Sequence, residues 1–122
     1  MNQIFDITTK KNYPLPEKLW LSEGTSYVGK MQIPYQKLID KLGKSNQDND
    51  GYKVDAEWLI STPAGIATIY NYKTGKNYCR NEGLEVEQIT DWHIGGSGNS
   101  KNVVAYIGKF LELDPFELDP FK

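Results

Sequence analysis

Residues 52–61 alternate between apolar and polar side chains, and a turn and a second β-rich run follow; this pattern restricts the possible folds more strongly than any other part of the sequence. In "YKVDAEWLISTPAGIATIYNY", apolar side chains occupy every second position of the first half, and the residues from Thr62 to Gly65 are typical of a tight turn. A period of two indicates a half-buried strand, because successive side chains of a strand point to opposite faces of the sheet. The sequence therefore predicts a β-hairpin.

The turn also predicts which residues of the hairpin lie opposite one another. If the two ends of the turn face each other, Trp58 pairs with Ile69, and Glu57 pairs with Tyr70. One face of the hairpin is then apolar and belongs to the core. The other face carries Asp55, Glu57, Leu59, Tyr70 and Tyr72, with Asp55 opposite Tyr72.

The remaining segments predict a sheet with two helices. Gly29 interrupts a strand-like composition, which predicts a strand with a bulge, and the helical spacing that follows begins at Pro34 and ends at Gly43. In chain order, we expect a strand over 24–33, a helix over 34–43, a polar loop over 44–51, a long loop over 73–85, a strand over 86–94, a turn over 95–99 and a second helix that Ser100 caps. The fold class is then α+β: an antiparallel sheet of four or five strands with two helices packed on one face.

The chain is long enough for a single domain, which we assign to residues 1–112. Residues 1–22 show no clear period and predict an N-terminal arm with at most one short strand. Residues 113–122 form a tail in which the tetrapeptide LDPF occurs twice, and each proline forbids a continuing helix. Such a tail could dock on a foreign protein through 113–121, or fold back on its own surface or on that of a neighbouring subunit.

Composition excludes several classes of protein. The net charge is −2 and no segment is strongly basic, so binding to nucleic acid is not expected. Cys79 is the only cysteine, which excludes an internal disulfide and a zinc site with several thiolates. No run of residues resembles a signal peptide or a membrane span, so we expect a cytoplasmic protein with no membrane contact.

The residue types that could carry catalysis are few. His93 is the only histidine, and no nucleophile or metal-binding motif accompanies it. Asp55 and Glu57 share one side of a strand and could form an acid/base pair, although this spacing is also typical of a solvated strand face. We therefore predict no catalytic residue, no metal and no cofactor.

Residues that could bind a small nucleotide are more numerous. The tyrosines and Trp92 offer flat faces for a base, lysines and Arg80 offer positive charge, and the glycine-rich segment precedes a helix whose N-terminus favours anions. The same aromatic residues could instead form an aromatic-rich core. The predicted ligand-binding residues are Tyr70, Tyr72, Lys73, Arg80, Trp92, His93, Gly95, Gly96 and Asn99, with His93 acting as a hydrogen-bond donor.

The strand "YKVDAEW", the strand "ATIYNYK" and the turn "WHIGG" resemble a pattern found in small proteins of bacteriophages and prophages. The resemblance covers roughly residues 24–110. Such proteins are often counter-defence factors, and the Thoeris anti-defence proteins are similar in size and in having an α+β core. That resemblance implies a homo-oligomer that sequesters a cyclic ADP-ribose signal in the host cytoplasm without cleaving it.

Two other functions are consistent with the same residues. The first is an inhibitor that blocks a host effector, such as a CRISPR nuclease, through the acidic hairpin face or the LDPF tail. The second is a small hydrolase that uses His93 with Asp55 or Glu57.

Overall fold

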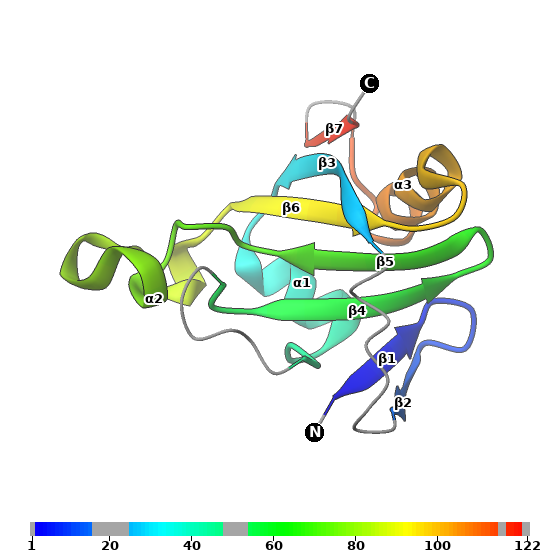
Figure 1. Ribbon diagram of the computed structural model, residues 1–122, viewed down its shortest axis with the longest axis horizontal. Coiled ribbons are helices and arrows are strands. Elements are labelled where there is room, and N and C mark those ends of the chain that lie inside the picture. The colour runs from blue at the N-terminus through cyan, green and yellow to red at the C-terminus, as the bar shows by residue number, and fades with distance from the viewer. Residues whose placement is uncertain (1, 16–24, 48–53, 115–116, 121–122) are drawn as a thin grey trace.

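The computed structural model describes residues 2–15, 25–47, 54–114 and 117–120. These residues form one mixed β-sheet with helices, which confirms the predicted α+β class (Figure 1). In spatial order, six strands of the sheet are β2 (Lys11–Pro14), β1 (Gln3–Asp6), β4 (Glu57–Thr62), β5 (Gly65–Tyr70), β6 (Asp91–Gly96) and β3 (Ser26–Gln32), and the short β7 (Leu118–Pro120) follows beside β3. The predicted number of four or five strands is therefore too low.

The N-terminal strands belong to the sheet, and they change its type. Strands β1 and β2 form an antiparallel hairpin, and β1 pairs in parallel with β4 through Phe5 opposite Ile60. The prediction of a purely antiparallel sheet is wrong at this edge. The sequence does not predict β1 and β2, because each has only four residues, too few to show a period. The parallel pairing of β1 with β4 could therefore not be predicted either. Residues 16–22 of the predicted arm lie outside the described residues.

The register of the central hairpin confirms the prediction. Glu57 lies opposite Tyr70, and Trp58 lies opposite Ile69. Thr62 fixes the turn, because its hydroxyl donates to the carbonyl of Gly65 (2.7 Å) and accepts from the N–H of the same residue (3.1 Å). The predicted pair of Asp55 with Tyr72 is not formed, since the strands end at Glu57 and Tyr70.

The described residues contain three helices, where two were predicted, and two of the three pack on one face of the sheet. Helix α1 (Tyr35–Leu42) follows Pro34 and ends at Gly43, whose φ of 79° lies in the left-handed region. Helix α3 (Ser100–Phe110) is capped by Asn99 and not by Ser100, because the Asn99 side chain accepts a hydrogen bond from the N–H of Asn102 (3.3 Å). The apolar side chains of both helices join those of the strands in one core, which includes Leu38, Leu42, Trp58, Ile60, Ile69, Trp92, Ile94, Val103 and Ile107.

The segment between β5 and β6 differs most from the sequence prediction. It holds the one-turn helix α2 (Lys76–Cys79) and two 3₁₀ turns, η2 (Arg80–Glu82) and η3 (Val86–Gln88), where a loop and the start of a strand were expected. Strand β6 begins at Asp91 and extends through Gly96, so the expected glycine turn is part of the strand. In Figure 1 this segment projects from the end of the sheet to which β5 leads.

The described part of the C-terminal tail packs on its own fold. Leu118 begins β7, which pairs antiparallel with β3, and both Leu113 and Leu118 contact the core. Gly108 of α3 makes room for this contact, since an added Cβ would lie 2.8 Å from the Leu118 side chain. Phe116 and Phe121 of the two LDPF repeats lie outside the described residues. Across the described ranges, no helix has the length and apolar character needed to span a membrane.

Candidate functional site

Three tyrosine rings surround the imidazole of His93 on the sheet face opposite the helices. The distances from the ring centroid of His93 are 4.9 Å to Tyr27, 5.6 Å to Tyr70 and 5.6 Å to Tyr72. The ring of Tyr72 is stacked on the imidazole, whereas that of Tyr70 meets it edge-on. We call these four residues the Tyr–His cluster. It combines aromatic faces with hydroxyl and imidazole hydrogen-bonding groups.

The sheet register explains why these side chains meet. His93 lies directly opposite Tyr70 of β5 on one side and opposite Lys30 of β3 on the other. Directly opposed residues share a face, so the three side chains project to the same side. Tyr72 follows the end of β5 and brings its ring over the imidazole.

A β-bulge adds Tyr27 to the cluster. Tyr27 and Lys30 are three residues apart, so regular alternation would place them on opposite faces. The register of β3 shifts between Tyr27 and Gly29, and Tyr27 consequently lies opposite Gly95, on the His93 side. The extra residue, Val28, turns into the core.

Burial favours the neutral forms of His93 and Tyr70. Burial lowers the pKa of His93, and the Lys30 ammonium acts in the same direction, whereas the Asp91 carboxylate partly opposes both. Burial also raises the pKa of Tyr70, and the charge of Glu57 adds to this effect. A neutral imidazole and a protonated phenol can each donate and accept hydrogen bonds.

Two lysines supply positive charge beside these neutral groups. Lys30 lies directly across from His93 in the sheet. The ammonium of Lys73 lies 5.2 Å from the ring centroids of both Tyr72 and Tyr78, within the range of a cation–π contact. Arg80, which the sequence placed in the same site, is exposed at the junction of α2 and η2, and no contact among the described residues joins it to the cluster.

Trp92 does not share this site, which corrects the sequence prediction. Its side chain is 0% exposed and packs against Trp58 (5.6 Å between ring centroids) and Tyr35 (6.0 Å). Trp92 and His93 are adjacent in β6 and therefore point to opposite faces of the sheet. The alternative of an aromatic-rich core is thus correct for Trp92, while the Tyr–His cluster lies on the other face.

The predicted glycine cradle for phosphate is also absent from the described residues. Gly95 and Gly96 lie in β6 between β5 and β3, so their peptide groups belong to the sheet ladder. Asn99 uses its side-chain oxygen to cap α3. Glycine is needed at position 95 for a different reason: an added Cβ would lie 2.4 Å from the hydroxyl oxygen of Thr68.

Asp55 has a structural role that the sequence did not reveal. Its carboxylate accepts hydrogen bonds from the Asn71 side chain (2.9 Å) and from the N–H of Asn77 (3.2 Å), which fastens the α2 segment to the start of β4. The nearby Cys79 thiol donates to the carbonyl of Lys73 (3.2 Å). Within the described ranges, no group of three or more histidine, cysteine or carboxylate side chains could hold a metal ion.

Of the nine predicted ligand-binding residues, the structure brings together Tyr70, Tyr72, Lys73 and His93. Tyr27 and Lys30 were missed. Gly29 suggested a bulge in their strand, but the resulting change of face depends on the register with β6, which the sequence does not show.

Comparisons with known proteins identify no relative of this chain. A scan against protein-family models finds no match, and searches of curated proteins and of solved structures find none.

Proposed function

We propose that the protein binds a small nucleotide at the Tyr–His cluster and holds it without chemical conversion. The observation that carries this proposal is the convergence of three tyrosine rings on His93, with Lys30 and Lys73 beside them. Stacking of a base on an aromatic side chain contributes about 1–3 kcal/mol, and lysine ammonium groups attract phosphates. The cluster thus offers both kinds of contact that a nucleotide requires.

The surroundings of His93 favour binding over catalysis. A general base needs an oriented partner within hydrogen-bond reach, and the ring contacts of His93 among the described residues are with tyrosines. Asp55, one of the two carboxylates predicted as partners in a hydrolytic site, accepts hydrogen bonds from Asn71 and Asn77 instead. In this proposal the neutral imidazole of His93 lines the site and forms hydrogen bonds with the nucleotide.

The biological role in this proposal rests on the resemblance of the sequence to phage counter-defence proteins. A protein that binds a cyclic nucleotide signal tightly, and does not cleave it, lowers the free concentration of the signal and so withholds it from a host defence system. In such a role a homo-oligomer carries one Tyr–His cluster per subunit.

Isothermal titration calorimetry with ADP-ribose and cyclic ADP-ribose tests the binding. Tyr72→Ala removes an exposed ring that is stacked on His93, and we expect it to weaken binding about tenfold or more. Tyr13→Ala is the matched control, because Tyr13 is similarly exposed (42%) but lies on the edge strand β2. Equal affinity of both variants and the wild type, or no binding of either nucleotide, would refute the proposal.

Recovery of the ligand separates binding from turnover. After incubation and heat denaturation, chromatography of the supernatant should return the nucleotide intact. Product that accumulates beyond one equivalent per protein chain would instead identify an enzyme. His93→Gln should then abolish that product if His93 is the base.

A further inference from the structure

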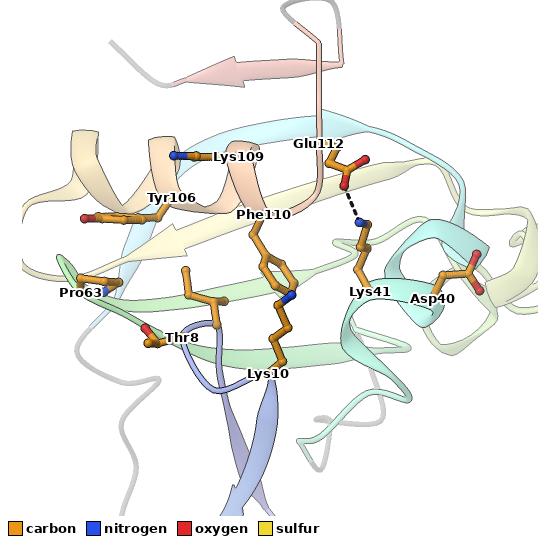
Figure 2. Close-up of a pocket in the computed structure, with 10 residues that line it drawn as sticks. Thr8, Lys10, Asp40, Lys41, Pro63, Tyr106, Lys109, Phe110 and Glu112 are labelled. Atoms are coloured by element: carbon orange, nitrogen blue, oxygen red, sulfur yellow. Dashed lines mark hydrogen bonds and ion pairs between the residues drawn. The ribbon is translucent and has the colours of Figure 1, made fainter.

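A second cavity lies on the helix side of the sheet, away from the Tyr–His cluster. It has a volume of about 540 Å³ and is formed by the β1–β2 turn, the β4–β5 turn, α1 and the end of α3 (Figure 2). Pockets for small molecules commonly have volumes of about 300–1,000 Å³. Four segments that are distant in the sequence thus line an open pocket of suitable size.

The apolar part of this cavity is flat and aromatic. Phe110 is held in place by Phe5, with 5.6 Å between their ring centroids. Ile7 is half-buried beside it, and Tyr106, one turn earlier on α3, is 39% exposed. Figure 2 shows Tyr106 and Phe110 from α3 together with Pro63 from the β4–β5 turn.

The charged part of the cavity has an excess of positive charge. Lys41 is paired with Glu112 at 2.8 Å, and the Asp40 carboxylate accepts a hydrogen bond from Gln36 (2.9 Å). Asp40 also points away from the other lining residues in Figure 2. Lys10 and Lys109 form no ion pair with any part of the chain that the structure describes.

The backbone at Lys10 adds a second observation. Its φ of 60° is left-handed, a conformation that asparagine and glycine adopt more readily than lysine. A hydrogen bond from its N–H to the carbonyl of Asp6 (2.7 Å) holds this turn, and in Figure 2 the ammonium reaches toward the ring of Phe110. The β1–β2 turn thus places the Lys10 ammonium on the side of the cavity that Phe110 lines.

We propose that this cavity binds a small anion with a flat apolar body, such as an aromatic carboxylate or an aromatic phosphate ester. Tyr106 and Phe110 contact the apolar body, and Lys10 and Lys109 attract the anionic group from the β1–β2 turn and from α3. The site is distinct from the Tyr–His cluster, because the two lie on opposite faces of the sheet.

Two probes that differ only in charge test the proposal on the unmodified protein. 2-Naphthoate carries the anion, and 2-naphthamide is its neutral analogue of nearly equal shape. In ¹H–¹⁵N NMR titrations at low salt, 2-naphthoate should shift the amides of Lys10, Tyr106 and Phe110 saturably, and 2-naphthamide should bind at least about tenfold more weakly. Equal affinity of the two probes, or shifts centred on the Tyr–His cluster, would overturn the proposal.

Charge-removing variants locate the anionic group. Lys10→Asn preserves the left-handed backbone while it removes the ammonium, and Lys109→Gln removes the other cation; we expect each to weaken 2-naphthoate binding about threefold to fivefold. Lys101→Gln, which changes an exposed lysine of α3 outside the cavity, should leave the affinity unchanged. Equal effects of all three variants would contradict a local site. Unchanged dispersion of the NMR spectrum verifies that each variant is folded.

Discussion

At the scale of single residues, Asn71 shows how much of the fold one buried side chain can organise. It is 0% exposed, and its carboxamide accepts from the N–H groups of Asp55 (2.7 Å) and Ala56 (3.1 Å). It also donates to the Asp55 carboxylate and to the Thr74 hydroxyl. One side chain thus closes the end of the β4–β5 hairpin and fastens the segment that carries Lys73 beside the cluster.

Asn71→Ala should lower the free energy of unfolding by about 2–4 kcal/mol, because buried donors and acceptors lose their partners. Urea denaturation followed by circular dichroism measures this change. Asn81→Ala serves as the control, because Asn81 is an exposed asparagine in the segment between β5 and β6. This substitution should change the free energy of unfolding by less than about 0.5 kcal/mol. A loss at Asn71 no larger than that of the control would contradict the structural role of this network.

His93 makes stability depend on pH, also at the residue scale. Its folded-state pKa is lowered, chiefly by burial, so the unfolded chain binds a proton more readily than the folded chain. The groups around it are Lys30, Tyr27, Tyr70, Tyr72 and Asp91. Stability should therefore fall as pH decreases below about 6.5, the ordinary histidine pKa, and level off below the lowered pKa.

Comparison of urea midpoints between pH 5 and pH 8 checks this prediction. His93→Gln keeps a polar side chain and does not titrate, so the difference between wild type and variant isolates the contribution of the imidazole. As pH falls, the urea midpoint of the wild type should decrease more than that of His93→Gln. A difference that stays constant across the range would show that His93 has an ordinary pKa in the folded protein.

At the scale of elements, the turn between β4 and β5 is locked to the connection between β6 and α3. Gly65 has a φ of 148°, and an added Cβ would lie 2.4 Å from the carbonyl oxygen of Ser97. The N–H of Ser97 in turn donates to the carbonyl of Ile66 (2.9 Å). This contact sets where β6 ends and α3 begins.

Gly65→Ala should destabilise the protein by more than about 2 kcal/mol, because the new methyl group adds a backbone clash to an unfavourable dihedral angle. Gly43→Ala is a matched comparison, since Gly43 also has a positive φ but nothing lies within 4 Å of an added Cβ. That variant should lose only about 1 kcal/mol. Thermal unfolding of both variants measures the difference, and equal losses would mean that the close contact with Ser97 is relieved without cost.

At the scale of the whole molecule, the elements with a clear period were predicted well. The hairpin was predicted from the alternation before the turn, its register from the turn between Thr62 and Gly65, and α1 from the helical spacing between Pro34 and Gly43. The candidate site was predicted in part, because Tyr70, Tyr72 and His93 do meet. The predicted strand over residues 86–94 already contained Trp92 and His93, and alternation along a strand places these neighbours on opposite faces, so they could not share one site.

The remaining features depend on contacts between distant segments. Neither the parallel pairing of β1 with β4 nor the bulge that brings Tyr27 to His93 has a local pattern that specifies its partner. Tertiary packing decides such pairings, and short strands carry little information of their own. The sequence could thus predict the layers of the molecule, but not the full order of its strands.

Strand β7 also protects the molecule from its own copies. By pairing with β3, it covers peptide groups that would otherwise form an open sheet edge, the kind of template on which identical chains add to one another as fibrils. The outermost strand on this side is then β7, which has three residues where β3 has seven, and so short an edge offers few peptide groups to an added chain.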